Sequence, residues 1–366
     1  MAVRAVNRWF APGRVNLMGG PDYNEVFVLP FALGAGVTVT AARRPDRRIT
    51  LVSRQADGPP VTLDIDALEP GSVRGWTAYP AGVAWALREA GYLGGGADLA
   101  IDADLPAGAG LSSSAALEAA SALALTELYQ VPVPRPELAA LTRRAENEFV
   151  GVPTGIMDQF AALLSRAGHA LLLDCRSGTA TVVPLDPAAA GLRLLIIDTR
   201  VRRAVADGRY AERRRACERA AAALGVRSLR DVEDVRELAR LDDPDLRRPA
   251  GHVVAENQRV LRAAELLRAG RCAAIGPLLT ESHRSVRDQF GMSWPQADEA
   301  VEAAVGTGAA GARMTGGGFG GCVIALVPVE HATQIRAAIT GRFTRRRWPA
   351  PRYLDAVPAD GARSVR

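Results

Sequence analysis

The pattern of apolar and polar positions is of two kinds, one typical of strands and one typical of helices, and segments of the two kinds alternate along the chain. Short runs rich in apolar and β-branched side chains, bounded by turn residues, are expected to be strands. Ala- and Leu-rich runs with apolar positions three to four residues apart are expected to be helices. The first half of the chain therefore predicts strands over 24–40, 49–54, 97–106 and 169–177, and helices over 76–91, 113–130 and 136–150.

The second half is mainly helical. A loop rich in Pro, Ala and Gly over 184–191 precedes an apolar strand over 192–200, and we expect the domain boundary at this loop. The chain would then divide into residues 1–189 and 190–366. Helices are predicted over 208–224, 230–241, 249–269, 271–288 and 295–306, followed by a strand from 322. The tail 358–366 is expected to be frayed.

Composition and charge exclude several classes of protein. With 366 residues, of which 48% are hydrophobic and 23% charged, the chain can bury a large core. The net charge of +5 is not concentrated in a basic stripe with aromatic residues, which argues against a nucleic-acid partner. No apolar run approaches the ~20 residues that cross a bilayer. The first residues also lack the features of a signal peptide, so we expect a cytoplasmic protein without a membrane partner.

The absence of lysine removes further possibilities. All 45 basic residues are arginine. A P-loop lysine, a Schiff base and a Ser–Lys dyad all need an ammonium group, so none of these mechanisms applies. The four cysteines lie far apart in the sequence, which excludes a disulfide scaffold and a zinc ribbon.

The most informative segment is DLPAGAGLSSSAALEAAS, residues 104–121. Pro106, Gly108 and Gly110 allow a tight turn in which the backbone approaches a ligand closely. The serines 112–114 then open a helix whose first N–H groups are unpaired, and such a helix end attracts phosphate. A plain turn with a capping serine is the alternative.

Two other segments have a similar character. Residues 11–24 place Arg14, Asn16, Asp22 and Asn24 among small residues, in a segment expected between strands. Residues 315–321 contain five glycines among seven positions and lead into a buried strand, which is more glycine than one turn requires. A single glycine-rich segment would be weak evidence for a site that binds a phosphorylated ligand, and three such segments are stronger evidence.

Together these segments resemble the signature motifs of the GHMP small-molecule kinases, most closely the galactokinase branch. The matching motifs are GRVNL, PAGAGLSSSAALE, AENEFVGVPTGIMDQF and ARMTGGGFGGC, and the likeness extends over roughly residues 8–330. GIMDQF followed by HALLLDCRS is typical of galactokinase-like members. The resemblance implies an α+β fold of two domains, with mixed β-sheets, helices and an active site in the cleft between the domains.

The resemblance also assigns the catalytic and metal-binding residues. Asp158 matches the aspartate that receives the proton of the sugar's anomeric hydroxyl, as a base or as an electrostatic partner. Arg14 matches the arginine beside it, which would stabilise charge on the transferred phosphoryl group. Ser114 and Glu146 match the pair that binds Mg²⁺. Taken alone, Glu146 would be an ordinary solvated residue of a charged helix.

The remaining site residues follow from the same motifs. The ATP phosphates would be surrounded by Pro106, Gly108, Ala109, Gly110, Leu111, Ser112, Ser113 and Ser114. Trp76 would line the adenine pocket. The sugar would contact Asp22 and Tyr210, and Gly317 and Gly318 would close over it. The implied cofactors are ATP and Mg²⁺.

The first motif departs from the family. Galactokinases usually read GEHTDYN where this chain has GGPDYN over 19–24, one residue shorter and without the Glu-His pair. The missing Glu is the family's partner for the distal end of galactose. We therefore expect either galactose or a larger or anionic sugar, such as a heptose or octose phosphate, since arginine favours anionic groups.

The sequence thus predicts an ATP-dependent kinase that phosphorylates the C1 hydroxyl of a sugar or sugar phosphate to the α-sugar 1-phosphate. The alternative is a catalytically silent sensor of sugar and ATP that acts through a protein partner. A monomer and a homodimer are both compatible with the sequence.

Overall fold

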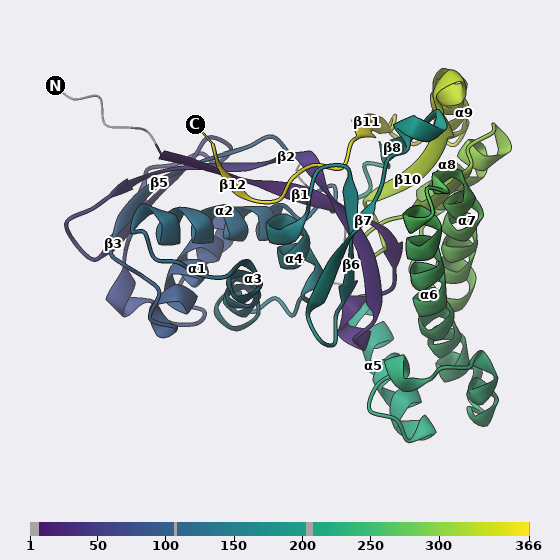
Figure 1. Cartoon of the computed structure of the whole chain (residues 1–366), viewed down its shortest axis with the longest axis horizontal. Helices are drawn as coiled ribbons and strands as arrows, with labels where there is room; N and C mark the ends of the chain where they lie inside the picture. The colour runs from purple at the N-terminus through teal and green to yellow at the C-terminus, as the bar shows by residue number, and fades with distance from the viewer. Residues whose placement is uncertain (1–6, 106–107, 203–207, 366) are drawn as a thin grey trace.

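The computed structural model describes residues 7–105, 108–202 and 208–365 and arranges their strands in two sheets (Figure 1). The larger sheet has the order β12-β1-β2-β5-β3-β4, and β6 pairs with both β2 and β7. Only β3 and β5 are parallel neighbours. The strands are β1 (Asn7–Gly19), β2 (Phe27–Arg43), β3 (Arg48–Ser53), β4 (Val61–Asp64), β5 (Ala97–Ala103), β6 (His169–Asp174), β7 (Thr179–Pro184) and β12 (Arg363–Val365).

Helices of the first half cover one face of this sheet (Figure 1). They are α1 (Ala78–Glu89), α2 (Ser113–Leu128), α3 (Arg135–Arg144) and α4 (Met157–Leu164). α2 is buried along most of its length and packs on β1 and β2. A π-helical turn, η4 (Ala145–Val150), continues α3, and such turns often occur at functional sites.

The second sheet is antiparallel in the order β11-β8-β10-β9. Its strands are β8 (Leu192–Asp198), β9 (Gly311–Met314), β10 (Cys322–Pro328) and β11 (Arg352–Ala356). The helices of this half are α5 (Arg209–Leu224), α6 (Pro244–Arg268), α7 (Gly276–Ser285), α8 (Pro295–Gly306) and α9 (Ala332–Arg345). The segment 184–191, expected as the domain boundary, lies between the strands of the two sheets.

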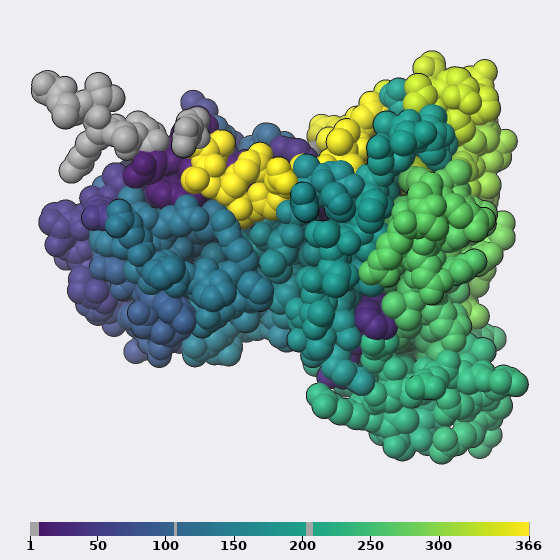
Figure 2. Space-filling model, in the orientation of Figure 1, coloured from purple at the N-terminus to yellow at the C-terminus, as the bar shows by residue number. Residues whose placement is uncertain are grey.

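Two predictions for the chain's strands were wrong. The tail is not frayed, because β12 returns to the first sheet and pairs with β1, with Ser364 opposite Trp9. Figure 2 shows this C-terminal segment lying across the N-terminal half of the molecule. Residues 11–19 belong to β1 rather than to a loop, and they are buried throughout. Long-range pairing with β2 decides this, which a local pattern of small residues does not reveal.

The helix boundaries were partly wrong as well. α8 begins and ends where the apolar spacing predicted. The predicted helix 230–241 is instead two 3₁₀ turns, η7 (Leu229–Asp231) and η8 (Val235–Arg240), each opened by its own capping box. α6 begins at Pro244, five residues before the predicted start, because Asp243 caps it and proline is well suited to the first helical position.

A continuous apolar core joins the sheets and helices. Its largest fully buried side chains include Phe31, Phe149, Phe290 and Phe343, which come from both halves of the chain. Among the described residues, no helix is both long and apolar enough to cross a membrane.

Candidate active site

The loop before α2 has the geometry expected for binding phosphate. Gly108 and Gly110 have φ of 73° and 74°, and Ser112 adopts the left-handed conformation with φ 59°. The amide of Arg14 donates to the carbonyl of Leu111 at 3.1 Å and attaches the loop to β1. Among the described residues, no side chain caps the start of α2, so its first N–H groups are available to an anion. Pro106 lies outside the described residues.

The strained Ser112 is itself part of this site. A non-glycine residue in the left-handed region costs of the order of 1 kcal/mol or more, and such residues cluster at functional sites. The hydroxyl of Ser112 donates to Asp158 Oδ2. The phosphate loop and the predicted catalytic aspartate are therefore in direct contact.

Arg14 and Asp158 form a two-point ion pair, although 144 residues separate them in sequence. Arg14 Nε donates to Asp158 Oδ1 at 2.8 Å, and the second terminal nitrogen donates to Oδ2 at 2.9 Å. The remaining nitrogen donates to the carbonyl of Gly110 at 3.0 Å. Arg14 is 4% exposed and Asp158 23%, so the pair is shielded but the carboxylate can be reached. The fork of donors fixes the orientation of this carboxylate.

Glu146 lies in η4 and contacts the start of α2. Its carboxyl group is hydrogen-bonded to Ser114, accepts from the Thr154 hydroxyl at 2.9 Å and accepts from Gln159 Nε2 at 2.7 Å. Burial and the nearby charge of Asp158 raise the pKa of Glu146. A bound cation would relieve both effects.

The Ser114–Glu146 pair fits a magnesium ion. Mg²⁺ in nucleotide sites is held by one or two protein oxygens, and it keeps water and phosphate oxygens as its other ligands. Within the ranges that the structure describes, no cluster of three or more His, Cys, Asp or Glu side chains could hold a metal ion. One hydroxyl and one carboxyl group beside a phosphate loop are the donor set that a nucleotide-bound Mg²⁺ requires.

Asp22 lies beside the same aspartate. In the short helix η1 (Asp22–Asn24), its carboxyl group accepts from the amide of Met157 at 3.1 Å, at the start of α4. It also occupies the space next to Gly155, where any side chain would collide with it. Burial, followed by the charge of Asp158, raises the pKa of Asp22. Two carboxyl groups, those of Asp22 and Asp158, therefore converge at the start of α4.

Tyr210, which is also predicted to contact the sugar, lies close to Asp22. Tyr210 lies at the start of α5, and its ring packs edge-on against Tyr23 with centroids 5.4 Å apart. Tyr23 follows Asp22 directly. The structure thus brings α5 next to the first motif.

The third glycine-rich segment meets the phosphate loop. Gly317 and Gly318 lie in the turn between β9 and β10. Gly318 has φ 77°, and a Cβ atom there would lie 2.5 Å from the Met292 carbonyl oxygen. Cys322, at the start of β10, directs its sulfur at the carbonyl of Ala109, 3.2 Å away. Glycine is therefore strongly favoured at position 318, and the turn packs against the loop expected to hold ATP.

Trp76 lies in the short helix η3 (Gly75–Thr77) and is half-buried against the core. Its role in an adenine pocket stays a prediction. Sequence reasoning did not identify Glu118, Gln159 or Thr154, which form a buried polar cluster with Glu146. A signal for Glu118 was present, because it is the one charged residue in the apolar run 113–126.

A second buried cluster was also missed. Glu256 of α6 is 1% exposed, and its Oε1 accepts from the Gly19 amide at 3.2 Å and the Ser282 hydroxyl at 2.6 Å. Arg313 of β9 lies 3.7 Å from this carboxylate and donates to the carbonyl of Gly19 at 3.4 Å. These residues connect the second sheet to the end of β1, next to the altered first motif.

His252 and His283 take part in packing and hydrogen bonding within the fold. His252 is fully buried, and burial lowers its pKa to about 4. His283 accepts from the Met314 amide at 3.2 Å and lies 3.1 Å from Asp298. Neither contacts the cluster around Asp158.

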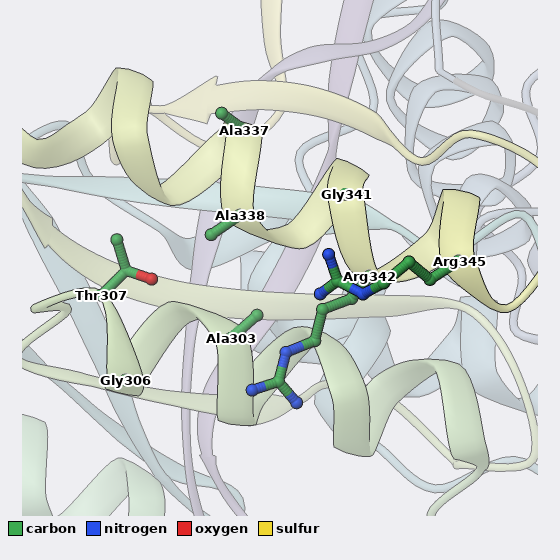
Figure 3. Close-up of a pocket in the computed structure, with 8 residues that line it drawn as sticks. All are labelled: Ala303, Gly306, Thr307, Ala337, Ala338, Gly341, Arg342 and Arg345. Atoms are coloured by element: carbon green, nitrogen blue, oxygen red, sulfur yellow. The ribbon is translucent and has the colours of Figure 1, made fainter.

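Two surface grooves lie away from the cluster around Asp158. One, of about 370 Å³, runs between α8 and α9 and is lined mainly by small residues, with Arg342 and Arg345 at one end (Figure 3). The other, of about 810 Å³, follows α6 and contains Arg247, Arg248 and Arg284. Neither groove contains a predicted site residue.

Comparisons with known proteins identify the family of this chain. Residues 78–166 match the N-terminal domain of GHMP kinases, residues 263–344 match the GHMP kinase C-terminal domain, and residues 4–43 match the galactokinase galactose-binding signature. Galactokinase of Streptomyces coelicolor is 48% identical over 362 residues, which are 98% of this chain and 94% of that protein. Galactokinase of Mycobacterium tuberculosis H37Rv is 47% identical over 341 residues, 91% of this chain and 93% of its own length.

Solved structures show the same relationship. Lactococcus lactis galactokinase complexed with galactose superposes with a TM-score of 0.93 at 32% identity, covering 99% of this chain and 96% of that one. Methanococcus jannaschii mevalonate kinase, at 16% identity and a TM-score of 0.69 over 98% of this chain and all of its own, shares the fold alone. The resemblance and the two-domain α+β fold are thus confirmed: the chain belongs to the galactokinase family of GHMP kinases and is a sugar kinase.

Proposed function

We propose that this protein transfers the γ-phosphoryl group of ATP, with Mg²⁺, to the C1 hydroxyl of galactose or a galactose-like sugar, giving the α-sugar 1-phosphate. The observation that carries the proposal is the contact between the phosphate loop and the Arg14–Asp158 pair. It puts a carboxylate, a guanidinium and free helix N–H groups around one point. Phosphoryl transfer depends mostly on such positioning and on charge stabilisation.

Each residue then has a defined task. Asp158 accepts the hydrogen bond of the attacking hydroxyl, as base or as electrostatic partner, and Arg14 fixes its orientation. Gly108–Ser114 bind the nucleotide phosphates through backbone N–H groups. Ser114 and Glu146 would hold the Mg²⁺, which when bound neutralises charge on the phosphate oxygens.

The altered first motif supports a wider choice of substrate. A Cβ atom built at Gly20 meets nothing within 4 Å among the described residues, so there is room beside the backbone at this position. Arg214 of α5, which is paired with Glu218 at 2.9 Å, lies 5.8 Å from the centre of the Tyr23 ring and is a guanidinium group near this side of the site. A larger or anionic sugar, such as a heptose or octose phosphate, is therefore part of the proposal alongside galactose.

A panel of acceptors tests both parts of the proposal. Purified protein is incubated with ATP, Mg²⁺ and galactose, seven- and eight-carbon sugars, or sugars phosphorylated at their distal end, and products are identified by ³¹P NMR. We expect an α-linked 1-phosphate with at least one acceptor. Turnover of galactose with ordinary efficiency and of none of the larger or anionic acceptors would restrict the substrate to galactose.

The panel also separates the kinase from the silent sensor. A sensor would bind sugar and ATP without consuming ATP. The complete set of Arg14, Ser114, Glu146 and Asp158 favours catalysis, because binding alone does not require an aspartate poised at the reacting hydroxyl. Binding of both ligands with no ATP consumption for any acceptor would reverse this preference.

A further inference from the structure

We propose that Glu118 and Gln159 form a buried positioning pair that holds the carboxyl group of Glu146 in the orientation needed to bind a divalent cation next to Ser114. This inference rests on the proposed function, because it concerns the same cation site. Neither residue contacts the sugar or the phosphates in this proposal. They act through Glu146.

The geometry of Gln159 carries the first step. Its side chain is 0% exposed, and its amide nitrogen donates to Glu146 Oε2 at 2.7 Å and to Glu118 Oε2 at 3.2 Å. A carboxamide has two N–H bonds in one rigid plane. The positions of the two carboxyl groups are therefore coupled, and anchoring Glu118 fixes the direction in which Gln159 points at Glu146.

The burial of Glu118 carries the second step. Glu118 is 0% exposed on a helix otherwise rich in Ala and Leu, and Gln159 is its one hydrogen-bond partner among the residues that the structure describes. Burying a polar group with so few partners costs of the order of kilocalories per mole. An apolar side chain would serve the packing of α2 better, so the packing of the core does not explain this residue.

The pair is also poorly arranged for stability alone. Glu118 Oε1 and Gln159 Oε1 are both buried, and neither has a hydrogen-bond partner in the part of the chain that the structure describes. Native proteins rarely leave such atoms unsatisfied unless the group has another task. Side chains that orient the ligands of a metal ion commonly lie directly behind those ligands, as this pair lies behind Glu146. Their loss typically weakens metal binding about 10–100-fold.

The arrangement of the elements agrees with this role. Glu118 belongs to α2, Gln159 to α4 and Glu146 to the π-helical turn η4, so the pair joins three elements at the cation site. Gln159 directly follows Asp158 on α4. The same short helix therefore presents one side chain to the acceptor hydroxyl and the next one to the cation-binding carboxyl group.

The test compares four variants of the full-length protein. Glu118→Leu removes the anchor, Glu118→Gln keeps an acceptor of the same shape, and Gln159→Met removes the amide while keeping an unbranched side chain. Thr142→Val is the control, since Thr142 is a fully buried polar residue of α3 that bonds only to carbonyls of its own helix. Mn²⁺ binding in the presence of a non-hydrolysable ATP analogue is measured by electron paramagnetic resonance, together with the Mg²⁺ concentration that gives half-maximal turnover and the melting temperature.

We expect Glu118→Leu and Gln159→Met to weaken Mn²⁺ binding and to raise the half-maximal Mg²⁺ concentration by about 10-fold or more. Glu118→Gln should stay within about 3-fold of the wild type, and Thr142→Val should change only the melting temperature. Should Glu118→Leu not fold, Gln159→Met decides the outcome.

Unchanged Mn²⁺ binding in the folded variants, or an equal loss in Glu118→Gln and Glu118→Leu, would overturn the proposal. Absence of sugar phosphorylation by the wild type would overturn the proposed function instead. The Mn²⁺ binding of the variants would still test whether Glu118 and Gln159 orient Glu146.

Discussion

At the scale of single residues, the site depends on what surrounds one carboxylate. Asp158 accepts from Arg14 at both oxygens and from Ser112 at one, and the Asp22 carboxyl group is near enough for the charge of Asp158 to raise its pKa. Fixed donors therefore hold the Asp158 carboxylate in one orientation. Such fixed charges stabilise a transition state without having to reorganise.

Replacing Asp158 by Asn should therefore lower kcat by a factor of about 10²–10⁴, the usual contribution of a positioned acid or base. The affinity for a non-hydrolysable ATP analogue should change by less than about 3-fold, because the analogue contacts the loop and the cation. Steady-state kinetics and calorimetry measure the two quantities.

The matched control is Asp186→Asn, which alters an exposed capping aspartate before the second sheet. It should leave kcat unchanged. If Asp158→Asn retained turnover within 10-fold of the wild type, Asp158 could not be the residue that activates the hydroxyl.

Of these residues, the sequence identified Arg14, Asp22 and Asp158 through motifs. It did not identify Glu118 or Gln159 as members of the site, because their role depends on contacts across 41 and 13 residues. A buried carboxyl group in an apolar helix can be recognised from sequence, but its partner cannot.

At the scale of elements, the glycine-rich turn before β10 shows how backbone conformation builds the site. Its residues hold the third motif against Met292 and, through Cys322, against the phosphate loop. Gly318 combines a positive φ with a close approach to the Met292 carbonyl. Both features require the absence of a Cβ atom.

Gly318→Ala should consequently lower the melting temperature and reduce kcat/KM, since the residue needs a left-handed conformation that costs alanine about 1 kcal/mol or more and the carbonyl must also move. Thermal unfolding and steady-state kinetics measure both effects. Gly306→Ala, at the end of α8, is the control, because a Cβ atom there meets nothing within 4 Å. Equal behaviour of the two variants would contradict this account of the turn.

Elements with strong local signals were predicted well, and those shaped by long-range pairing were not. α8 follows from its proline and its apolar spacing. β1 contains the small residues of the first motif, and only its pairing with β2 and β12 makes it a strand. Two short 3₁₀ turns, each with its own capping box, replace the helix expected over 230–241.

At the scale of the whole molecule, buried charges connect the two sheets. Glu256 of α6 contacts Gly19 of β1 and lies beside Arg313 of β9. Burial alone would raise the pKa of Glu256, but Arg313, His252 and Arg259 outweigh it and lower that pKa to about 2. The ionised form is therefore the one that the folded protein favours.

This pKa predicts a specific loss of stability in acid. Because the pKa of Glu256 is lower in the folded protein than its ordinary value of 4.5, its contribution is present above pH 4.5 and is lost as the pH falls toward 2. Glu256→Gln should reduce the free energy of unfolding at pH 7 by a few kcal/mol, on the order of 3. The difference between variant and wild type should shrink between pH about 4.5 and 2.

Urea unfolding followed by circular dichroism across this pH range measures the difference. The exposed Glu330→Gln is the control and should follow the wild type at every pH. A difference between Glu256→Gln and wild type that stays constant down to pH 2 would show that the carboxylate is not stabilised as the structure indicates.

The sequence by itself determined the phosphate loop, the three glycine-rich motifs, the resemblance to galactokinases and the altered first motif, since these depend on residue types at short spacings. The resemblance already placed Arg14 beside Asp158, and the tertiary structure decided the two-point geometry of this pair. It also decided which other distant side chains meet: Glu118 with Gln159, and Glu256 with Arg313. It also decided that the chain's last strand closes the first sheet. Hydrogen bonds and ion pairs act over a few ångströms, and only the folded backbone brings residues that are 41 to 144 positions apart in the sequence within that range.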